Sequence, residues 1–342
     1  MTKLISIIIL YFFSNFNVFA SETKGVITTI KPIESLVNAV IGDTGKTVSL
    51  IPPEISPHEF RLKPSDVRIL QNSNIVFYIS SHLETGIVKM FKNLPKNIKT
   101  INLMEETGID HLSIRDNEAW ELHDHDDHDK HDAKDKKHDD HDKHDAKDEK
   151  HDNHDKHDAK DEKHDDHDKH DTNDDIHIWL DPDNAIKIVR KINKELSLFF
   201  PKNAMIYNDN SSKLINEIES LKIELKKELL PIKDKPYIVF HDAYQYFERA
   251  FELNAIGSIA LENDVASSPK QISFIKDKIL KSQATCVFQE PQFDSKLVNT
   301  VVEGTKARIG ILDPIGVNIV EKENFYLQLL RNMSKSLKKC LG

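Results

Sequence analysis

The chain has 342 residues and a formal net charge of -10, with 47 lysines and arginines against 57 aspartates and glutamates. The charge is spread along the sequence without a basic stripe or a basic-aromatic patch, so nucleic-acid binding is excluded from the expected functions. One stretch, residues 123–171, consists mainly of His, Asp and Lys. The sequence outside it is long enough to form two lobes of modest size, each with a core.

Residues 1–20 have the organisation of a secretory signal: Lys3, an apolar run over 4–13, and small residues ending at Ala20. The alternative is a membrane anchor, but the apolar run is too short for a bilayer core, which needs about 20 residues. No cysteine lies near the cut, which argues against a lipid anchor. We therefore expect cleavage after Ala20 and a soluble protein of the periplasm.

The chain has two cysteines, Cys286 and Cys340. In an oxidising compartment such a pair is most simply a disulfide, which would stabilise the fold by roughly 4 kcal/mol in the chain-entropy model. The alternative is two buried free thiols. A thiolate zinc site is poorly supported because neither cysteine has a second one at ligand spacing.

Short apolar runs alternate with helix-like segments in the first part of the chain. Strands are expected over 26–30, 47–51 and 74–79 and near 101, with helices over 32–42, 64–71 and 83–91. A second alternation comes later, with strands over 237–241, 255–259, 285–289 and 308–312, and helices over 244–251, 269–282, 295–305 and from about 323. Such alternation predicts parallel sheets covered by helices.

Between these two parts lie two longer helical patterns. One runs to about 199, with Asp181 or Asp183 as its N-cap. The other covers 201–231 and carries an apolar stripe at helical spacing. The predicted fold is α/β: an N-terminal lobe (21–200, with an insertion at about 121–174), a long rigid linking helix (201–231) and a C-terminal lobe (236–342). A metal cleft is expected between the lobes, because open α/β sheets bind ligands beyond the carboxyl ends of their strands.

The insertion contains a repeat with a period of 13, KHDDHDKHDAKDE, in which no large apolar residue is available for burial. We therefore expect a solvated, disordered segment. Histidine-rich tracts are typical of metal binding, and each chelate would pay an ordering entropy, so weak auxiliary metal sites are expected here. Their histidines are His123, His125, His128, His131, His138, His141, His144, His151, His154, His157, His164, His167 and His170.

Outside the insertion, three histidines occupy similar topological positions. His58 follows a predicted strand, His241 ends one, and His177 precedes a helix; Asp313 also follows a strand directly. Three imidazoles and one carboxylate would form a four-ligand site suited to Zn(II), with Mn(II) possible if carboxylates dominate. A histidine at a strand end is equally compatible with a structural hydrogen bond, so spacing alone leaves both interpretations open.

Five segments carry a resemblance that covers the mature chain: SPHEFRLKPSDVRILQNSNIVF, HIWLDPDNA, VFHDAYQYFE, ATCVFQEPQFDSKLV and RIGILDPIG. In this order they resemble the signature segments of the zinc-binding periplasmic component of bacterial zinc ABC importers, the ZnuA type of metal receptor. The resemblance includes an acidic, histidine-rich insertion at the same place and the positions of both cysteines.

The resemblance implies a receptor, not an enzyme, that binds Zn(II) with high affinity between two lobes and delivers it to an ABC permease with a cytoplasmic ATPase. It implies His58, His177 and His241 as ligands. Some relatives have a glutamate where this chain has Pro57, so that ligand is lost. Asp313 matches the carboxylate ligand of manganese-type relatives, and water is the alternative. We expect a monomer.

Three other functions compete with this one. A manganese receptor of the same family would use the same site. An exported zinc buffer or adhesin would bind zinc without transport. A zinc hydrolase would need a placed general base beside an open coordination position, and the sequence has no evident candidate for that base.

Overall fold

The computed structural model describes residues 22–115, 174–260, 269–320 and 324–342. The predicted signal at 1–20 lies outside the described residues, and so do the thirteen histidines of the insertion. Within the described ranges, no helix combines the length and the apolar character needed to cross a membrane.

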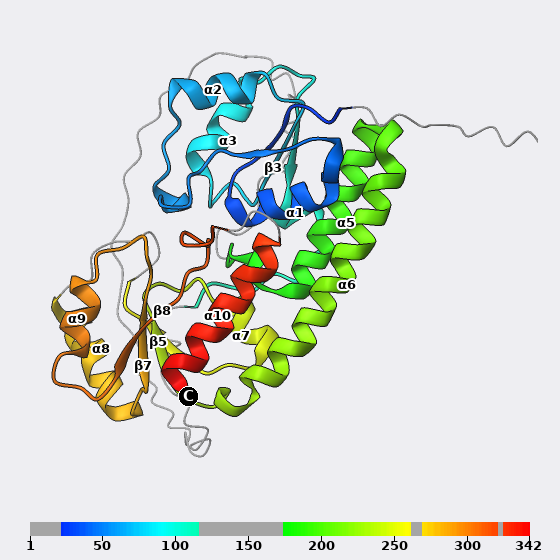
Figure 1. The fold of residues 1–342 in the computed structure, drawn as a ribbon. Helices are drawn as coiled ribbons and strands as arrows, with labels where there is room; N and C mark the ends of the chain where they lie inside the picture. Colours follow the sequence, from blue (N-terminus) through cyan, green and yellow to red (C-terminus); the bar gives the residue numbers. More distant parts are fainter. Residues whose placement is uncertain (1–21, 116–173, 261–268, 321–323) are drawn as a thin grey trace, which may run out of the picture. The chain divides into compact units, whose positions relative to one another are not determined.

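The first lobe, drawn in blue and cyan in Figure 1, is built on a parallel sheet. The sheet has four strands in the order β2-β1-β3-β4. Its strands are β1 (Val26–Thr28), β2 (Val48–Ser49), β3 (Ile75–Tyr78) and β4 (Lys99–Asn102). Its helices are α1 (Lys31–Ile41), α2 (Pro64–Gln71), α3 (Thr85–Phe91) and α4 (Leu103–Glu106). In α1 the apolar residues recur at helical spacing, and the face that they form is buried against the core.

The second lobe repeats this plan with a parallel sheet of order β6-β5-β7-β8. Its strands are β5 (Tyr237–Val239), β6 (Ala255–Ser258), β7 (Cys286–Gln289) and β8 (Arg308–Ile311). Helices α7 (Gln245–Phe251), α8 (Pro269–Ser282) and α9 (Lys296–Val302) connect them. In both sheets the chain starts in an inner strand and then moves to each side, so the prediction of two parallel-sheet α/β lobes is confirmed.

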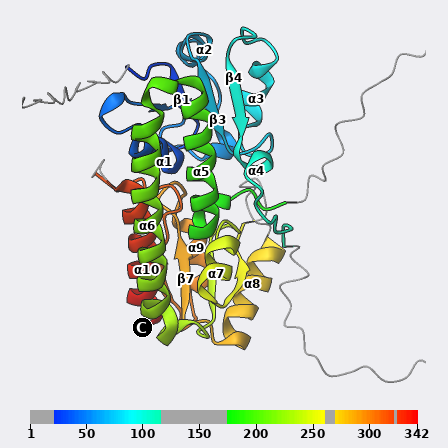
Figure 2. The same ribbon diagram turned by 90° about the vertical axis from the view of Figure 1, so that its right-hand side faces the viewer.

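Three long helices complete the fold: α5 (Pro182–Phe199), α6 (Ala204–Leu229) and α10 (Phe325–Leu341). The side chain of Asp181 accepts the N–H of Asp183 and so caps α5. Helix α6 packs against α1 and α5 as well as α7 and α10, and it runs beside elements of both lobes (Figures 1 and 2). The predicted apolar stripe is buried along it, at Leu214, Ile218, Leu221, Leu225 and Leu229.

The predicted linking helix is thus α6, and the residue limits predicted for the two lobes stay a prediction. The predicted disulfide is confirmed: Cys286 in β7 is bonded to Cys340 in α10, with the two Cα atoms 6.1 Å apart. It joins the second sheet to the last helix and closes a sequence separation of 54 residues.

Candidate metal centre

Three loops at the ends of strands and at the start of a helix bring the candidate histidines together. His58 lies in the short 3-10 turn Pro57–Glu59 after β2, and His241 lies two residues after β5. His177 precedes the turn Ile178–Leu180 that leads into α5. Because both sheets are parallel, the loops after their strands gather at the carboxyl edges, where ligands of α/β folds bind.

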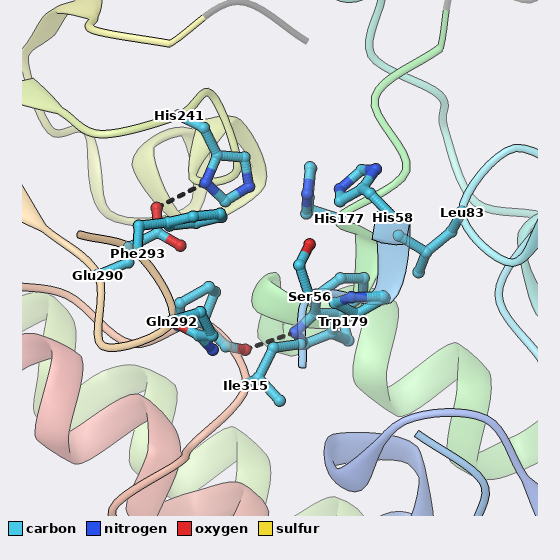
Figure 3. Close-up of a pocket in the computed structure, with 12 residues that line it drawn as sticks. Ser56, His58, Leu83, His177, Trp179, His241, Glu290, Gln292, Phe293 and Ile315 are labelled. Atoms are coloured by element: carbon cyan, nitrogen blue, oxygen red, sulfur yellow. Dashed lines mark hydrogen bonds and ion pairs between the residues drawn. The ribbon is translucent and has the colours of Figure 1, made fainter. Parts of the chain in front are cut away.

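The three imidazole rings face a common point, as Figure 3 shows. One ring nitrogen from each histidine lies within 4.8 Å of the other two. The ring centroids are 5.7 Å apart for His58 and His177, 6.1 Å for His58 and His241, and 5.3 Å for His177 and His241. Tetrahedral zinc with Zn–N bonds of about 2.0–2.1 Å needs ligand nitrogens roughly 3.3 Å apart, so small movements would suffice for coordination.

Two of the rings are oriented by buried carboxylates. Asp175 lies 2.8 Å from Nδ1 of His177 and also accepts the backbone N–H of that residue. Glu290 Oε1 lies 2.6 Å from Nδ1 of His241. An ionised carboxylate can only accept, so Nδ1 carries the proton in each ring and the lone pair is on Nε2. This pairing of carboxylate and histidine is the arrangement that fixes ring orientation in metal sites.

The third ring is kept neutral by its surroundings. Burial, followed by the neighbouring imidazoles of His177 and His241, lowers the pKa of His58 to about 3. A metal ligand must be the neutral imidazole, because a proton on the coordinating nitrogen blocks the lone pair. His58 therefore needs no deprotonation step before it can bind a metal ion near neutral pH.

The rings line a cavity of about 20 Å³. A cavity of roughly 10–15 Å³ on this measure holds one water, so the space between the rings is of the size of a single ion or water. Its other walls include Leu83, Trp179, Phe293, Pro314 and Ile315. Trp179 donates its indole N–H to the carbonyl of Pro314 at 2.9 Å, which ties the start of α5 to the loop after β8.

A family model for the periplasmic component A of zinc-uptake complexes matches residues 26–340. The chain belongs to this ZnuA family. A Brucella suis protein named "High-affinity zinc uptake system protein ZnuA" is 42% identical over 323 residues, covering 94% of this chain and 93% of the relative. This membership confirms the resemblance of the five sequence segments, and the family is one of solute-binding receptors in zinc uptake, not a family of enzymes.

Two solved structures show the same fold. A ZnuA crystal structure has a TM-score of 0.70 and 21% identity, covering 94% of this chain and 100% of the other. A ZnuA deletion mutant with zinc bound has a TM-score of 0.69 and 21% identity, covering 94% and 98%. The end-to-end coverage agrees with the two-lobe architecture described above.

Asp313 is placed differently from the three histidines. It follows β8, but its Oδ1 accepts the backbone N–H groups of Ile315 at 3.2 Å and Gly316 at 2.7 Å. Burial raises the pKa of Asp313, while these backbone bonds act in the opposite direction. The cluster of possible ligand atoms within the described residues does not include it. A role for Asp313 as fourth ligand of this ZnuA-family site stays a prediction.

In the sequence, Glu290 directly follows the predicted strand over 285–289 and faces the expected cleft, so sequence reasoning predicts a supporting or structural role for it, which agrees with its contact to His241. It missed Asp175, although a usable signal was present: an aspartate two residues before a candidate ligand can reach both the backbone N–H and the ring of that histidine. It also missed the pairing of His111 with Asp174, whose Nδ1 and Oδ2 are 2.7 Å apart, beside the ends of the insertion.

Proposed function

We propose that the chain is a periplasmic receptor that binds one Zn(II) ion with high affinity through His58, His177 and His241. The observation that carries the proposal is the meeting of three ring nitrogens within 4.8 Å of one another at a cavity sized for one ion. The receptor delivers zinc to an ABC permease that a cytoplasmic ATPase drives. The relatives named for high-affinity zinc uptake support this function.

The donor set favours zinc over manganese. Imidazole nitrogen suits Zn(II), whereas Mn(II) is better served by carboxylate, carbonyl and water oxygens. Asp175 and Glu290 are hydrogen-bonded to the Nδ1 atoms of His177 and His241, so these carboxylates orient the rings and do not coordinate the ion. The fourth position is taken by Asp313 after a rearrangement of its turn, or by water.

Delivery requires that a tight site be opened. In our proposal, docking on the permease moves one of the three loops and removes a ligand, which lowers the affinity at the point of transfer. A variant with a cross-link across the cleft should bind zinc but fail to transport it. Normal transport by the cross-linked variant would refute this release mechanism.

The segments outside the described residues have supporting roles in this proposal. Cleavage after Ala20 releases a soluble monomer into the periplasm. The insertion collects zinc at weaker, interchangeable sites and passes it to the histidine cluster. The cluster therefore binds the first ion, and the insertion binds further ions at higher zinc concentration.

The decisive experiment is a competition titration of the purified mature chain with zinc and manganese against a chelator of known affinity. His58→Ala, His177→Ala and His241→Ala should each lose more than the roughly 10- to 100-fold that is typical when an outer partner of a metal ligand is removed. His82→Ala is the matched control, since His82 is exposed and outside the cluster. Wild-type affinity in any of the three cluster variants, or tighter binding of manganese, would refute the assignment.

Two further experiments, one on the purified chain and one on cells, test two rival functions. A hydrolase would turn over ester or phosphoester substrates in the presence of zinc, and we expect no turnover. A zinc buffer or adhesin without transport would leave growth in low zinc unchanged when its gene is deleted, whereas loss of the receptor should stop that growth.

A further inference from the structure

A short segment before the insertion, residues 112–115, forms a strap between the loop that carries His177 and the loop that carries His241. Ser113 is bridged to Asp174 in antiparallel fashion, and the backbone N–H of Asp175 donates to the carbonyl of Leu112 at 2.7 Å. Asp175 is also the residue that holds the ring of His177. One edge of the strap is therefore fixed to the loop that presents His177.

The strap is also hydrogen-bonded to helix α7 of the second lobe. The backbone N–H of Leu112 donates to the hydroxyl of Tyr246 at 3.1 Å, and the side-chain amide of Gln245 donates to the carbonyl of Ser113 at 3.2 Å. Both partners belong to α7, the helix that follows His241 in the chain. A segment of the first half of the sequence is thus bonded to the element next to the His241 loop.

At the end of the strap, Arg115 binds the partly buried carboxylate of Asp242 and the buried carboxylate of Glu248. Its Nε donates to Asp242 at 2.9 Å, a second nitrogen also donates to Asp242, and a third donates to Glu248 at 2.6 Å. The side chains of Asp242 and Glu248 are 15% and 6% exposed. The guanidinium matches a carboxylate with two parallel bonds, which fixes direction as well as distance. Asp242 follows His241 directly in the sequence. This fork, the pair of hydrogen bonds from Arg115 to Asp242, therefore holds the loop that carries His241.

We propose that Arg115 is a positioning residue that sets the spacing between His177 and His241. The strap holds the His177 loop through Asp175, and Arg115 holds the His241 loop through Asp242. Neither contact involves a member of the cluster of ligand nitrogens, so the effect on the site is transmitted through the two loops. This role rests on the proposed zinc-binding function of the histidine cluster.

The test compares Arg115→Met, Asp242→Asn and the double variant by zinc competition titration and by the visible spectrum of the Co(II)-loaded chain. Each single variant should lose about tenfold in zinc affinity, the lower end of the range for outer partners of metal ligands, and should shift the Co(II) bands. Both substitutions act on the bonds between Arg115 and Asp242, and Arg115→Met also removes the bond to Glu248. The double variant should therefore lose little more zinc affinity than Arg115→Met alone. If the fold-loss in zinc affinity of the double variant equals the product of the fold-losses of the two single variants, the proposal is refuted.

Two further variants separate geometry from charge and from general destabilisation. Arg115→Lys keeps the charge without the fork, so it should not restore affinity; full affinity in this variant would refute positioning by the fork. Arg331→Met is the matched control, because Arg331 pairs with Glu224 on an exposed surface. It should bind zinc like the wild type. If Arg115→Met does not fold, Asp242→Asn and Arg115→Lys still decide the question.

Failure of this inference is distinguishable from failure of the proposed function. If the wild type and Arg331→Met do not bind zinc tightly, the proposed function is wrong. If both bind zinc tightly and the folded Arg115→Met chain binds it equally well with an unchanged Co(II) spectrum, only the role of Arg115 is wrong.

Discussion

Replacement of Glu290 by glutamine tests how much of the zinc affinity comes from the carboxylate behind His241. The side chain of Glu290 is 2% exposed, and its Oε1 lies 2.6 Å from Nδ1 of the ring. Glutamine has nearly the same shape and can still accept the Nδ1–H bond through its carbonyl oxygen. The substitution therefore removes the negative charge while the orientation of the ring is largely kept.

The magnitude follows from the kind of bond that is exchanged. A hydrogen bond to a charged group contributes about 1.5–3 kcal/mol and a neutral one about 0.5–1.5 kcal/mol, so the change costs roughly 1–1.5 kcal/mol. Zinc adds positive charge to the ring, so this cost appears mainly in the metal-bound state. Since 1.4 kcal/mol corresponds to a factor of ten, Glu290→Gln should bind zinc about tenfold more weakly.

The assay is a chelator competition titration, with unfolding of the metal-free chain followed separately in excess EDTA. We expect weaker zinc binding at nearly unchanged metal-free stability. Glu303→Gln is the control, because Glu303 is exposed. Wild-type zinc affinity in a folded Glu290→Gln chain would refute the reasoning. So would a loss of metal-free stability as large as the loss in binding, because that would assign Glu290 a structural role.

Three further predictions concern protons, the disulfide and the insertion. Burial lowers the pKa of His58 from 6.5 to about 3. Below about pH 6.5 this side chain therefore binds a proton in the unfolded metal-free chain but stays neutral in the folded chain, which lowers the free energy of unfolding. Between about pH 7.5 and about pH 4.5, the wild type should therefore lose roughly 1–2 kcal/mol more unfolding free energy than His58→Asn, allowing for partial solvent screening. The measurement is denaturant unfolding of both chains in EDTA at each pH. An equal loss of stability in the two chains would contradict the prediction. Replacing both Cys286 and Cys340 by alanine should lower the free energy of unfolding by about 4 kcal/mol in the chain-entropy model, measured by denaturant titration against the oxidised wild type. Deletion of residues 124–171 should remove the weaker zinc ions and keep one tight ion in a calorimetric titration; loss of that first ion would reverse the order proposed for the two kinds of site.

Local signals in the sequence were sufficient for much of the fold. Proline is preorganised for the first turn of a helix, and α2 and α8 begin at Pro64 and Pro269 as predicted. The strands came out shorter than predicted at their ends, as with β2, where only Val48–Ser49 pairs with β1. The apolar character of this strand continues into its flank, and so does its hydrogen bonding, because the backbone N–H groups of Leu50 and Ile51 still donate to the carbonyls of Thr28 and Thr29.

The candidate site was predictable to the extent that topology decides it. Parallel strands end at a common edge, and this alone predicts that His58 and His241 lie near ligand-binding edges. The direction of Asp313 depends on the turn after β8, whose backbone N–H groups bind its carboxylate. The contact of Arg115 with Asp242 spans 127 residues, and no local pattern predicts a pairing at that separation.

The bridge between Ser113 and Asp174 also bears on how the length of the insertion can change. The segment between these two residues is built from 13-residue repeats, so its length can be changed by whole units. The entropy of closing a flexible loop grows slowly, by about 0.6 kcal/mol for each doubling of its length. Because the bridge joins the two residues on either side of the segment, we expect a chain with one repeat unit more or fewer to keep the hydrogen bond from Asp175 to Leu112, and with it the position of His177.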